Sequence, residues 1–229
     1  MAEPDGIPAR MKQDWNERAR TDARYFIAKT TDGDAFEASA EEDIVVLLDG
    51  LDNILSPQAR VLDVGCGIGR LMKPLAARVS EIHGVDVSGE MIQRAHRYLD
   101  GFPNVRLFEN NGADLSSLDG PYDFVYSYLM FQHIPDRSIV QRYLHEVDRV
   151  LKPGGVFRFQ MDGRGDRPFW RAYRAVRSSS SWRGALWTRT AIIDAAQAAG
   201  FDVLDCRVDP RKKGLMRYAY VWVTCVKRT

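Results

Sequence analysis

The stretch Val61-Leu62-Asp63-Val64-Gly65-Cys66-Gly67-Ile68-Gly69 decides the fold. A short apolar run stops in three glycines at alternate positions, and residues 70–75 then have the pattern of a helix start. A buried strand, a glycine turn and a helix in this order are typical of a parallel α/β sheet, in which ligands meet the backbone at the turn. Glycine suits such a turn because it accepts positive φ and lets a ligand approach the main chain.

Two carboxylates narrow the choice of ligand. A dinucleotide-binding turn has the pattern G-x-G-x-x-G, whereas Arg70 stands here at the place of the third glycine. Asp63 lies at the end of the strand, where it would repel a pyrophosphate and suits an ammonium group. Asp86 ends the next apolar run, 21 residues after Gly65, at the distance expected for a carboxylate that binds a ribose diol. S-adenosylmethionine, with its amino-acid end and its ribose, fits both acids.

Several blocks in a fixed order extend this pattern, and with them the chain resembles the class I S-adenosylmethionine-dependent methyltransferases. The blocks are Val61–Gly69, Gly84–Met91, Gly112–Leu115, and the pair Tyr122–Pro135 and Leu151–Gly155. They lie within about residues 44–160, and a weaker match continues to the end. The resemblance implies an α/β fold with a Rossmann-like, seven-stranded, mostly parallel sheet, helices on both faces and an antiparallel last strand.

The resemblance also implies how the first half of the cofactor is bound. The backbone of Gly65, Cys66 and Gly67 is expected to face the methionyl part. Asp63 is expected to reach the amino group and Asp86 to accept from the ribose hydroxyls. An alternative for the Cys66 side chain is that it only fills the turn.

The adenine is expected to lie between the second and third blocks. Val87 and Met91 would flank the ring, and the backbone of Ala113 or Leu115 would meet it. Asp114 would accept a hydrogen bond from the adenine amino group. The alternative for Asp114 is that it caps a helix or a turn.

The fourth block is expected to contain the chemistry. Ser127 and Tyr128 would line the methionyl channel, and residues 129–135 would form the floor of the active site. His133 is the candidate general base because its ordinary pKa lies near 6.5; the alternative is a histidine that only holds the loop. Gln132 is expected to orient a substrate. Some lipid-modifying relatives have an acid at this position, so the amide argues against their carbocation chemistry.

The pattern along the chain predicts four parts. Residues 1–56 form an N-terminal helical extension or lid, with residues 1–10 disordered, and residues 57–161 form the cofactor-binding core. Residues 162–187 form an inserted cap rich in Arg and Trp, and residues 188–229 add a helix and a β-hairpin that complete the core. In the extension, Ser39 and Glu42 have the spacing of a capping box, and Ser56-Pro57 would end that helix.

The sequence leaves two interpretations open for the N-terminal extension and for the cap. Trp15 and Arg18 of the first helix would face the ligand in a lid, or would only dock the helix on the core. In the cap, arginines recur at steps of three and four and would share one helix face: Arg164, Arg167, Arg171 and Arg174. That face would bind an acidic or flat substrate or RNA, or would be a solvated basic surface.

Composition sets the outer limits. The chain has 229 residues, 45% of them hydrophobic and 28% charged, and its net charge of +1 gives no general attraction to nucleic acid or membranes. Three cysteines without metal-like spacing indicate free thiols in a reducing compartment, and no metal site is expected. No apolar run approaches 18 residues and no signal pattern opens the chain, so we expect a cytoplasmic protein.

The function that these patterns favour is transfer of a methyl group from S-adenosylmethionine to an oxygen or nitrogen of a small-molecule metabolite. We expect a small-molecule methyl acceptor as partner, with no nucleic acid and no membrane, and the sequence leaves the oligomeric state open. One alternative is an RNA- or protein-directed methyltransferase that uses the basic insertion. Another is a protein that binds the cofactor without catalysis.

Overall fold

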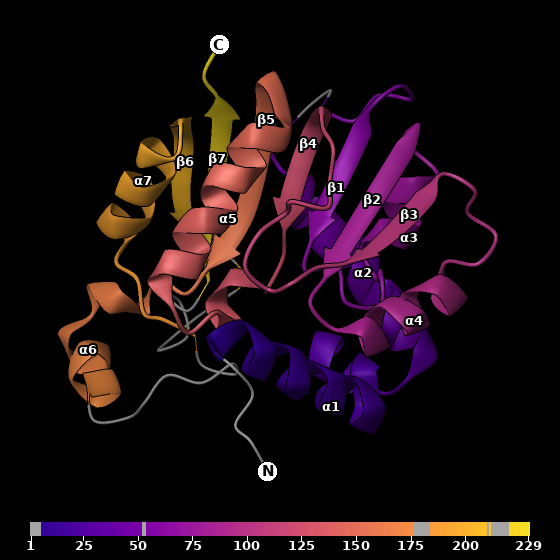
Figure 1. The fold of residues 1–229 in the computed structure, drawn as a ribbon, viewed down its shortest axis with the longest axis horizontal. Helices are drawn as coiled ribbons and strands as arrows, with labels where there is room; N and C mark the ends of the chain where they lie inside the picture. Colours follow the sequence, from indigo (N-terminus) through magenta and orange to yellow (C-terminus); the bar gives the residue numbers. More distant parts are fainter. Residues whose placement is uncertain (1–5, 52–53, 176–183, 210, 212–219) are drawn as a thin grey trace. The chain divides into compact units, whose positions relative to one another are not determined.

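A computed structural model describes residues 6–51, 54–175, 184–209, 211 and 220–229. Seven strands form one sheet in the order β3-β2-β1-β4-β5-β7-β6 (Figure 1). The strands are β1 (Arg60–Val64), β2 (Glu81–Asp86), β3 (Val105–Glu109), β4 (Tyr122–Ser127), β5 (Leu151–Met161), β6 (Phe201–Val208) and β7 (Val221–Lys227). β1, β2 and β3 pair in parallel, whereas β7 is antiparallel to both β5 and β6. The predicted fold class, with its antiparallel last strand, is confirmed.

Most helices begin at a side chain that accepts a backbone N–H, because the first turn of a helix leaves such donors without partners. Asp32, Ser88, Asp136 and Thr188 do this for α2, α4, α5 and α7. The α-helices are α1 (Gly6–Ala28), α2 (Gly33–Leu48), α3 (Met72–Ala76), α4 (Gly89–Tyr98), α5 (Arg137–Val150), α6 (Pro168–Ala175) and α7 (Arg189–Ala198). Two short 3₁₀ helices are η1 (Phe131–His133) and η2 (Arg164–Asp166). Within the described residues, none of the helices has the length and apolar character needed to cross a membrane.

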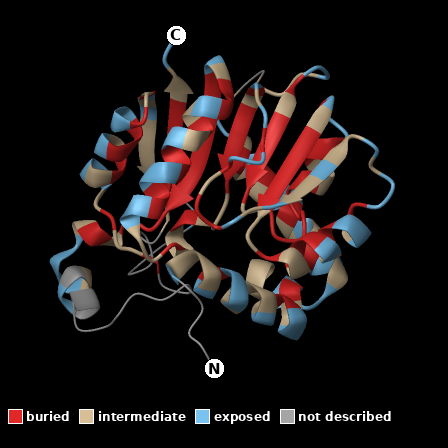
Figure 2. Cartoon of the chain, viewed as in Figure 1, coloured by how far each residue is buried: buried red, intermediate tan, exposed pale blue. Residues whose placement is uncertain are grey.

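The chain forms two compact units. The first contains Met1–Gly112 and Tyr122–Phe124, and the second contains Ala113–Pro121 and Val125–Thr229. In the first unit β1 and β2 are buried along nearly their whole length, as expected for parallel strands covered by helices. In the second unit β5 is buried from Gly155 onward, and most of this strand is red in Figure 2. The four parts predicted from the sequence were defined by expected function and do not coincide with these two compact units. Their boundaries stay a prediction.

An aromatic cluster forms the core of the second unit. Phe157 and Phe159 of β5 stack with ring centroids 4.7 Å apart. Phe131 of η1 meets both rings edge to face, at 6.2 and 5.5 Å. α5 covers this cluster with one apolar face, from Ile139 to Val150, as its helical spacing predicts. The segment that contains the candidate base is therefore anchored in the core by the residue two positions before it.

The N-terminal extension differs from the prediction in three places. Residues 6–10 are helical where disorder was expected. α2 begins at Gly33, because Asp32 accepts from the backbone N–H of Ala35 at 2.8 Å. Ser39 therefore lies inside the helix, where its hydroxyl donates to the carbonyl of Phe36, and the predicted capping box is wrong. The helix ends at Leu48, before Ser56-Pro57, and Gly50 follows with a φ of +72°.

The predicted arginine face of the cap is also wrong. Arg164 lies in η2, and Arg167 follows it with an extended backbone, so neither belongs to α6. α6 begins at Pro168, a residue suited to the first turn of a helix because it has no N–H to satisfy. The serine run at 178–181 and Trp182 lie outside the described residues.

Candidate functional site

The glycine turn after β1 has the backbone conformation that the sequence predicts. Gly65, Gly67 and Gly69 have φ values of +82°, +56° and +83°. The N–H groups of Gly65 and Cys66 donate to the carbonyl of Val85 in β2, at 2.8 and 3.1 Å. The turn is thereby fixed to the end of the neighbouring strand. L-residues rarely adopt this region of φ, so a side chain at Gly65 would strain the turn.

Asp86, at the carboxyl end of β2, is bound directly to this turn. Its Oδ2 accepts from the N–H of Gly67 at 2.9 Å, and its Oδ1 accepts from the N–H of Ser88 at 2.8 Å. Burial raises the pKa of Asp86 to about 6, Glu109 adds to the rise, and the backbone hydrogen bonds oppose it. The carboxylate is thus held in one orientation beside the glycines, as binding of a diol requires.

Asp63 and Cys66 lie close to this carboxylate. Asp63 is only 3% exposed. Burial raises the pKa of the Cys66 thiol well above its usual value, and the charges of Asp86 and Asp63 raise it further. Cys66 is therefore a neutral thiol, and its sulfur lies 2.9 Å from the position that a Cβ on Gly84 would take. This agrees with a side chain that fills the turn.

Val87 and Met91 lie in different surroundings. The Cγ2 of Val87 lies 2.8 Å from the position of a Cβ on Gly112, so the second and third sequence blocks meet there. Met91 is buried in an apolar cluster with Ala19 and Phe36. Val87 thus lies against the third sequence block, whereas Met91 packs in the core, and their contacts with adenine stay a prediction.

One face of α1 lies along the same edge, and sequence reasoning missed it. Asn16 Oδ1 accepts from the hydroxyl of Ser88 at 2.7 Å and from the N–H of Glu90 at 3.2 Å. Lys12 forms an ion pair with Glu109. The residues of this face are spaced by four, which is the helical signal that could have revealed them: Pro8, Lys12, Asn16 and Arg20.

The other end of α1 packs beside the glycine turn. The Cδ1 of Ile27 lies 2.9 Å from the position of a Cβ on Gly67. Trp15 packs against the apolar cluster that contains Met91, and the guanidinium of Arg18 lies 5.1 Å from the Trp15 ring. Trp15 therefore packs α1 against the core, which is one of the two alternatives that the sequence left open. A break in the helical backbone at Asp22 divides α1.

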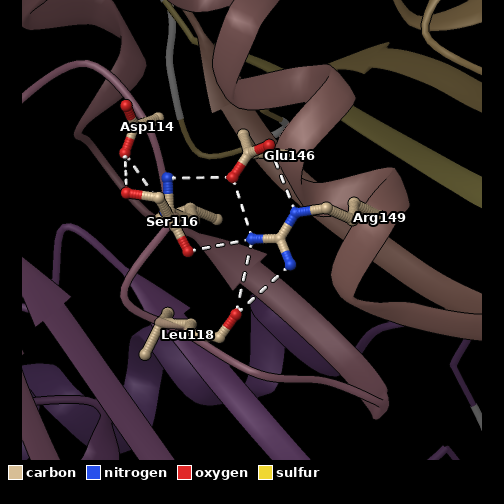
Figure 3. A network of polar contacts seen from close by, with 6 residues as sticks. Asp114, Ser116, Leu118, Glu146 and Arg149 are labelled. Carbon is tan, nitrogen blue, oxygen red and sulfur yellow. Dashed lines mark hydrogen bonds and ion pairs between the residues drawn. The ribbon is translucent and has the colours of Figure 1, made fainter.

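In the second unit, residues 113–118 form a loop that α5 holds (Figure 3). Ala113 and Leu115 are buried. Oδ1 of Asp114 accepts from both the N–H and the hydroxyl of Ser116, at 3.1 and 2.7 Å, so Asp114 caps a turn. Its proposed adenine contact would then use its second oxygen.

The candidate catalytic segment follows β4. Ser127 is fully buried, and Leu129 has a φ of +59°, a strained value for a residue with a branched side chain. The Gln132 amide nitrogen lies 3.3 Å from Nε2 of His133. This contact suits an unprotonated Nε2 that accepts a hydrogen bond. The two predicted catalytic residues are thus neighbours that contact each other.

Backbone contacts join the C-terminal end of the cap to this segment. The N–H of Ala185 donates to the carbonyl of Ile134 at 2.7 Å. A Cβ on Gly184 would lie 2.1 Å from the Gln132 carbonyl oxygen, so only glycine fits there. Gly165 and Trp187, at the two ends of the cap, are joined by a backbone hydrogen bond of 3.0 Å. The cap therefore ends beside the candidate catalytic residues.

A buried carboxylate fixes Tyr128, a link that sequence reasoning also missed. Asp209 is fully buried and accepts from Trp222 Nε1 at 3.2 Å and from Arg211 Nη2 at 2.9 Å. Arg211 Nη2 also donates to the Tyr128 hydroxyl at 3.3 Å, and the Tyr128 ring stacks on Trp222 at 5.5 Å. Tyr128 and Trp222 lie farther along the chain from Asp209 and Arg211, so no local spacing signals the link.

The donor set fits S-adenosylmethionine. Two carboxylates at the glycine turn suit an ammonium group and a diol and would repel a pyrophosphate. In the part of the chain that the structure describes, no group of three or more His, Cys, Asp or Glu side chains could hold a metal ion.

Comparisons with known proteins agree with this geometry. Residues 61–155 match the family model described as a methyltransferase domain. The chain is 34% identical over 108 residues to 2-methyl-6-phytyl-1,4-hydroquinone methyltransferase of Synechocystis, covering 47% of this chain and 33% of the relative. It is 35% identical over 112 residues to trans-aconitate 2-methyltransferase of Deinococcus radiodurans, covering 48% of this chain and 40% of the relative. The chain thus spans less than half the length of these curated relatives.

Solved structures show the same fold. The structure of magnesium protoporphyrin IX methyltransferase from Synechocystis with bound S-adenosylhomocysteine matches with a TM-score of 0.70 at 16% identity, over 97% of this chain and all of that one. A complex of DhpI with S-adenosylhomocysteine matches with a TM-score of 0.64 at 20% identity, over 97% of this chain and 98% of that one. Over residues 61–155 the chain thus matches a methyltransferase domain, and its seven-stranded sheet and glycine turn resemble those of the class I S-adenosylmethionine-dependent methyltransferases.

Proposed function

We propose that this chain transfers a methyl group from S-adenosylmethionine to an oxygen or nitrogen of a small-molecule metabolite. The observation that carries the proposal is the contact between Asp86 and the glycine turn, in which the carboxylate is held by the N–H groups of Gly67 and Ser88. When bound, S-adenosylmethionine supplies a methyl group already activated by the positive sulfur. The protein then has to hold the cofactor, align the acceptor with the methyl group and exclude water.

Residues of the first unit would hold the cofactor. Asp86 would accept from both ribose hydroxyls, and the buried Asp63 would accept from the ammonium group. The backbone of Gly65, Cys66 and Gly67 would lie against the methionyl part. Among the residues of the second unit, Asp114 and the backbone of Ala113 or Leu115 would read the adenine.

Residues of the second unit would also act on the acceptor. Once the Gln132 amide turns from His133 Nε2 to the acceptor, this nitrogen would take the proton from the acceptor hydroxyl or amine as the methyl group arrives, leaving a neutral methylated product and a protonated imidazole. Gln132 would orient the acceptor or the imidazole. Tyr128, fixed by Trp222 and Arg211, would form a rigid wall beside them.

The small-molecule class of acceptor has three supports. The net charge of the chain is only +1. The arginines of the cap base are also paired with carboxylates: Arg164 with Asp162, and Arg189 with Asp166 at 2.8 Å. The relatives named above act, by their names, on a hydroquinone, on aconitate and on a porphyrin.

The test is release of S-adenosylhomocysteine from S-adenosylmethionine in the presence of a panel of hydroxyl, carboxyl and amine metabolites. We expect release with at least one of them, and loss of release in Asp86→Ala. Release that is as fast in folded Asp86→Ala as in the unchanged protein would contradict the proposed site.

A further inference from the structure

Two side chains of α5 hold the loop that precedes β4 by its backbone (Figure 3). Arg149 Nη2 donates to the carbonyl oxygens of Leu115, at 3.0 Å, and Leu118, at 3.4 Å. Arg149 Nη1 also donates to Leu118 at 3.4 Å. Glu146 Oε2 accepts from the N–H of Leu115 at 3.3 Å. Side chains of one helix thus occupy both backbone groups of Leu115.

Glu146 and Arg149 also hold each other. Glu146 Oε2 accepts from Arg149 Nη2 at 2.9 Å, and Oε1 accepts from Nε at 3.2 Å. The hydrogen bonds and charge of Glu146 raise the pKa of Arg149, so the guanidinium stays charged. The pair is partly exposed and contributes little to stability by itself. Its hydrogen bonds to backbone groups are charge-assisted, which makes them strong and directional.

Contacts within the loop also hold it. Leu115 and Leu118 are buried and anchor it by packing. Asp114 accepts from Ser116, and the N–H of Leu118 donates to the carbonyl of Leu115 at 2.9 Å. The two side chains of α5 add contacts from outside the loop to both backbone groups of Leu115 and so fix the orientation of this turn relative to the helix.

We propose that Glu146 and Arg149 are positioning residues for recognition of the adenine base. They do not touch the ligand in this account. By fixing the backbone of Leu115, they orient the two residues before it, so that the backbone of Ala113 and the carboxylate of Asp114 face the ring and its amino group. This proposal rests on the proposed function, because it needs the loop to bind adenine.

The test compares two ligands in calorimetric titrations. S-adenosylhomocysteine carries the adenine amino group, whereas S-inosylhomocysteine has an oxygen in its place. In Arg149→Met we expect the dissociation constant for S-adenosylhomocysteine to rise about tenfold, as for one lost charge-assisted hydrogen bond, and that for S-inosylhomocysteine to rise about twofold. The preference for the amino group should thus fall about fivefold.

Two further variants make the test specific. Arg142→Met removes an exposed arginine from the same helix and should change neither affinity. Arg149→Lys keeps one cationic donor and should restore part of the preference, and it also serves if Arg149→Met does not fold.

The possible outcomes distinguish failure of the positioning role from failure of the proposed function. If the affinities for both ligands fall by the same factor, or if neither changes, the positioning role is wrong while the proposed function stands. If the unchanged protein binds neither ligand, the proposed function fails and the positioning role fails with it.

Discussion

At the scale of single residues, Asp86 combines two demands. Its carboxylate must be ionised to accept from a ribose diol, yet its burial favours the protonated acid and raises its pKa to about 6. Protonation should therefore weaken binding of the cofactor within the pH range in which many proteins stay folded.

We expect the dissociation constant for S-adenosylhomocysteine to be roughly tenfold higher at pH 5 than at pH 7, because only the ionised Asp86 binds and about nine tenths of it is protonated at pH 5. Calorimetric titration across this range measures the effect. Glu109→Gln should move the midpoint to lower pH, because Glu109 raises the pKa of Asp86. A pH dependence that persists unchanged in Asp86→Asn would assign the effect to another group.

His133 is the residue for which the sequence left two roles open. If it is the general base, His133→Ala should lower turnover about a hundredfold or more, with affinity for S-adenosylhomocysteine nearly unchanged. His145→Ala, an exposed histidine on α5, is the matched control. Turnover by folded His133→Ala that equals that of the control near neutral pH would make His133 a structural residue.

At the scale of elements, α1 is joined to the loop after β2 by polar side chains rather than by apolar packing alone. Asn16 is the central contact, because it accepts from both Ser88 and Glu90 at the start of α4. These contacts hold the segment that carries Asp86 and Val87.

Asn16→Ala should therefore raise the dissociation rate constant of S-adenosylhomocysteine by about three- to tenfold, as expected for loss of about 1 kcal/mol of hydrogen bonding. Stopped-flow displacement measures this rate, and Gln13→Ala, an exposed residue of the same helix, is the control. An unchanged rate in Asn16→Ala would mean that α1 has no part in retaining the ligand.

The elements also show what a sequence can predict. The glycine turn and Asp86 lie within a short, regularly spaced segment, so their arrangement follows from strand and turn rules. Ser39 and Glu42 have the spacing of a capping box, but Asp32 caps the helix seven residues earlier, so the local pattern does not mark the helix start. Glu146 contacts Leu115 and Arg211 contacts Tyr128, 31 and 83 positions away in the sequence, and only the folded chain brings such pairs together.

At the scale of the whole molecule, the charge of the protein favours a small-molecule acceptor over RNA. The net charge is +1, and near the cap Arg164, Arg189 and Arg211 each pair with an aspartate. A surface that binds RNA needs cations that are free to displace counterions.

We therefore expect no retention of RNA by this protein at physiological salt in a filter-binding or anisotropy titration. Binding whose affinity falls steeply with salt would instead support the alternative in which the acceptor is RNA.

The central claim is that the glycine turn and Asp86 form an S-adenosylmethionine site. Its most direct test is calorimetric titration of the full chain at pH 7.5 with S-adenosylmethionine and S-adenosylhomocysteine, alongside Asp86→Ala. We predict micromolar binding to the unchanged protein and affinity more than tenfold weaker in the variant, because the paired hydrogen bonds to the ribose are lost. Equal affinity of both proteins, or no binding by a well-folded sample, would contradict the claim.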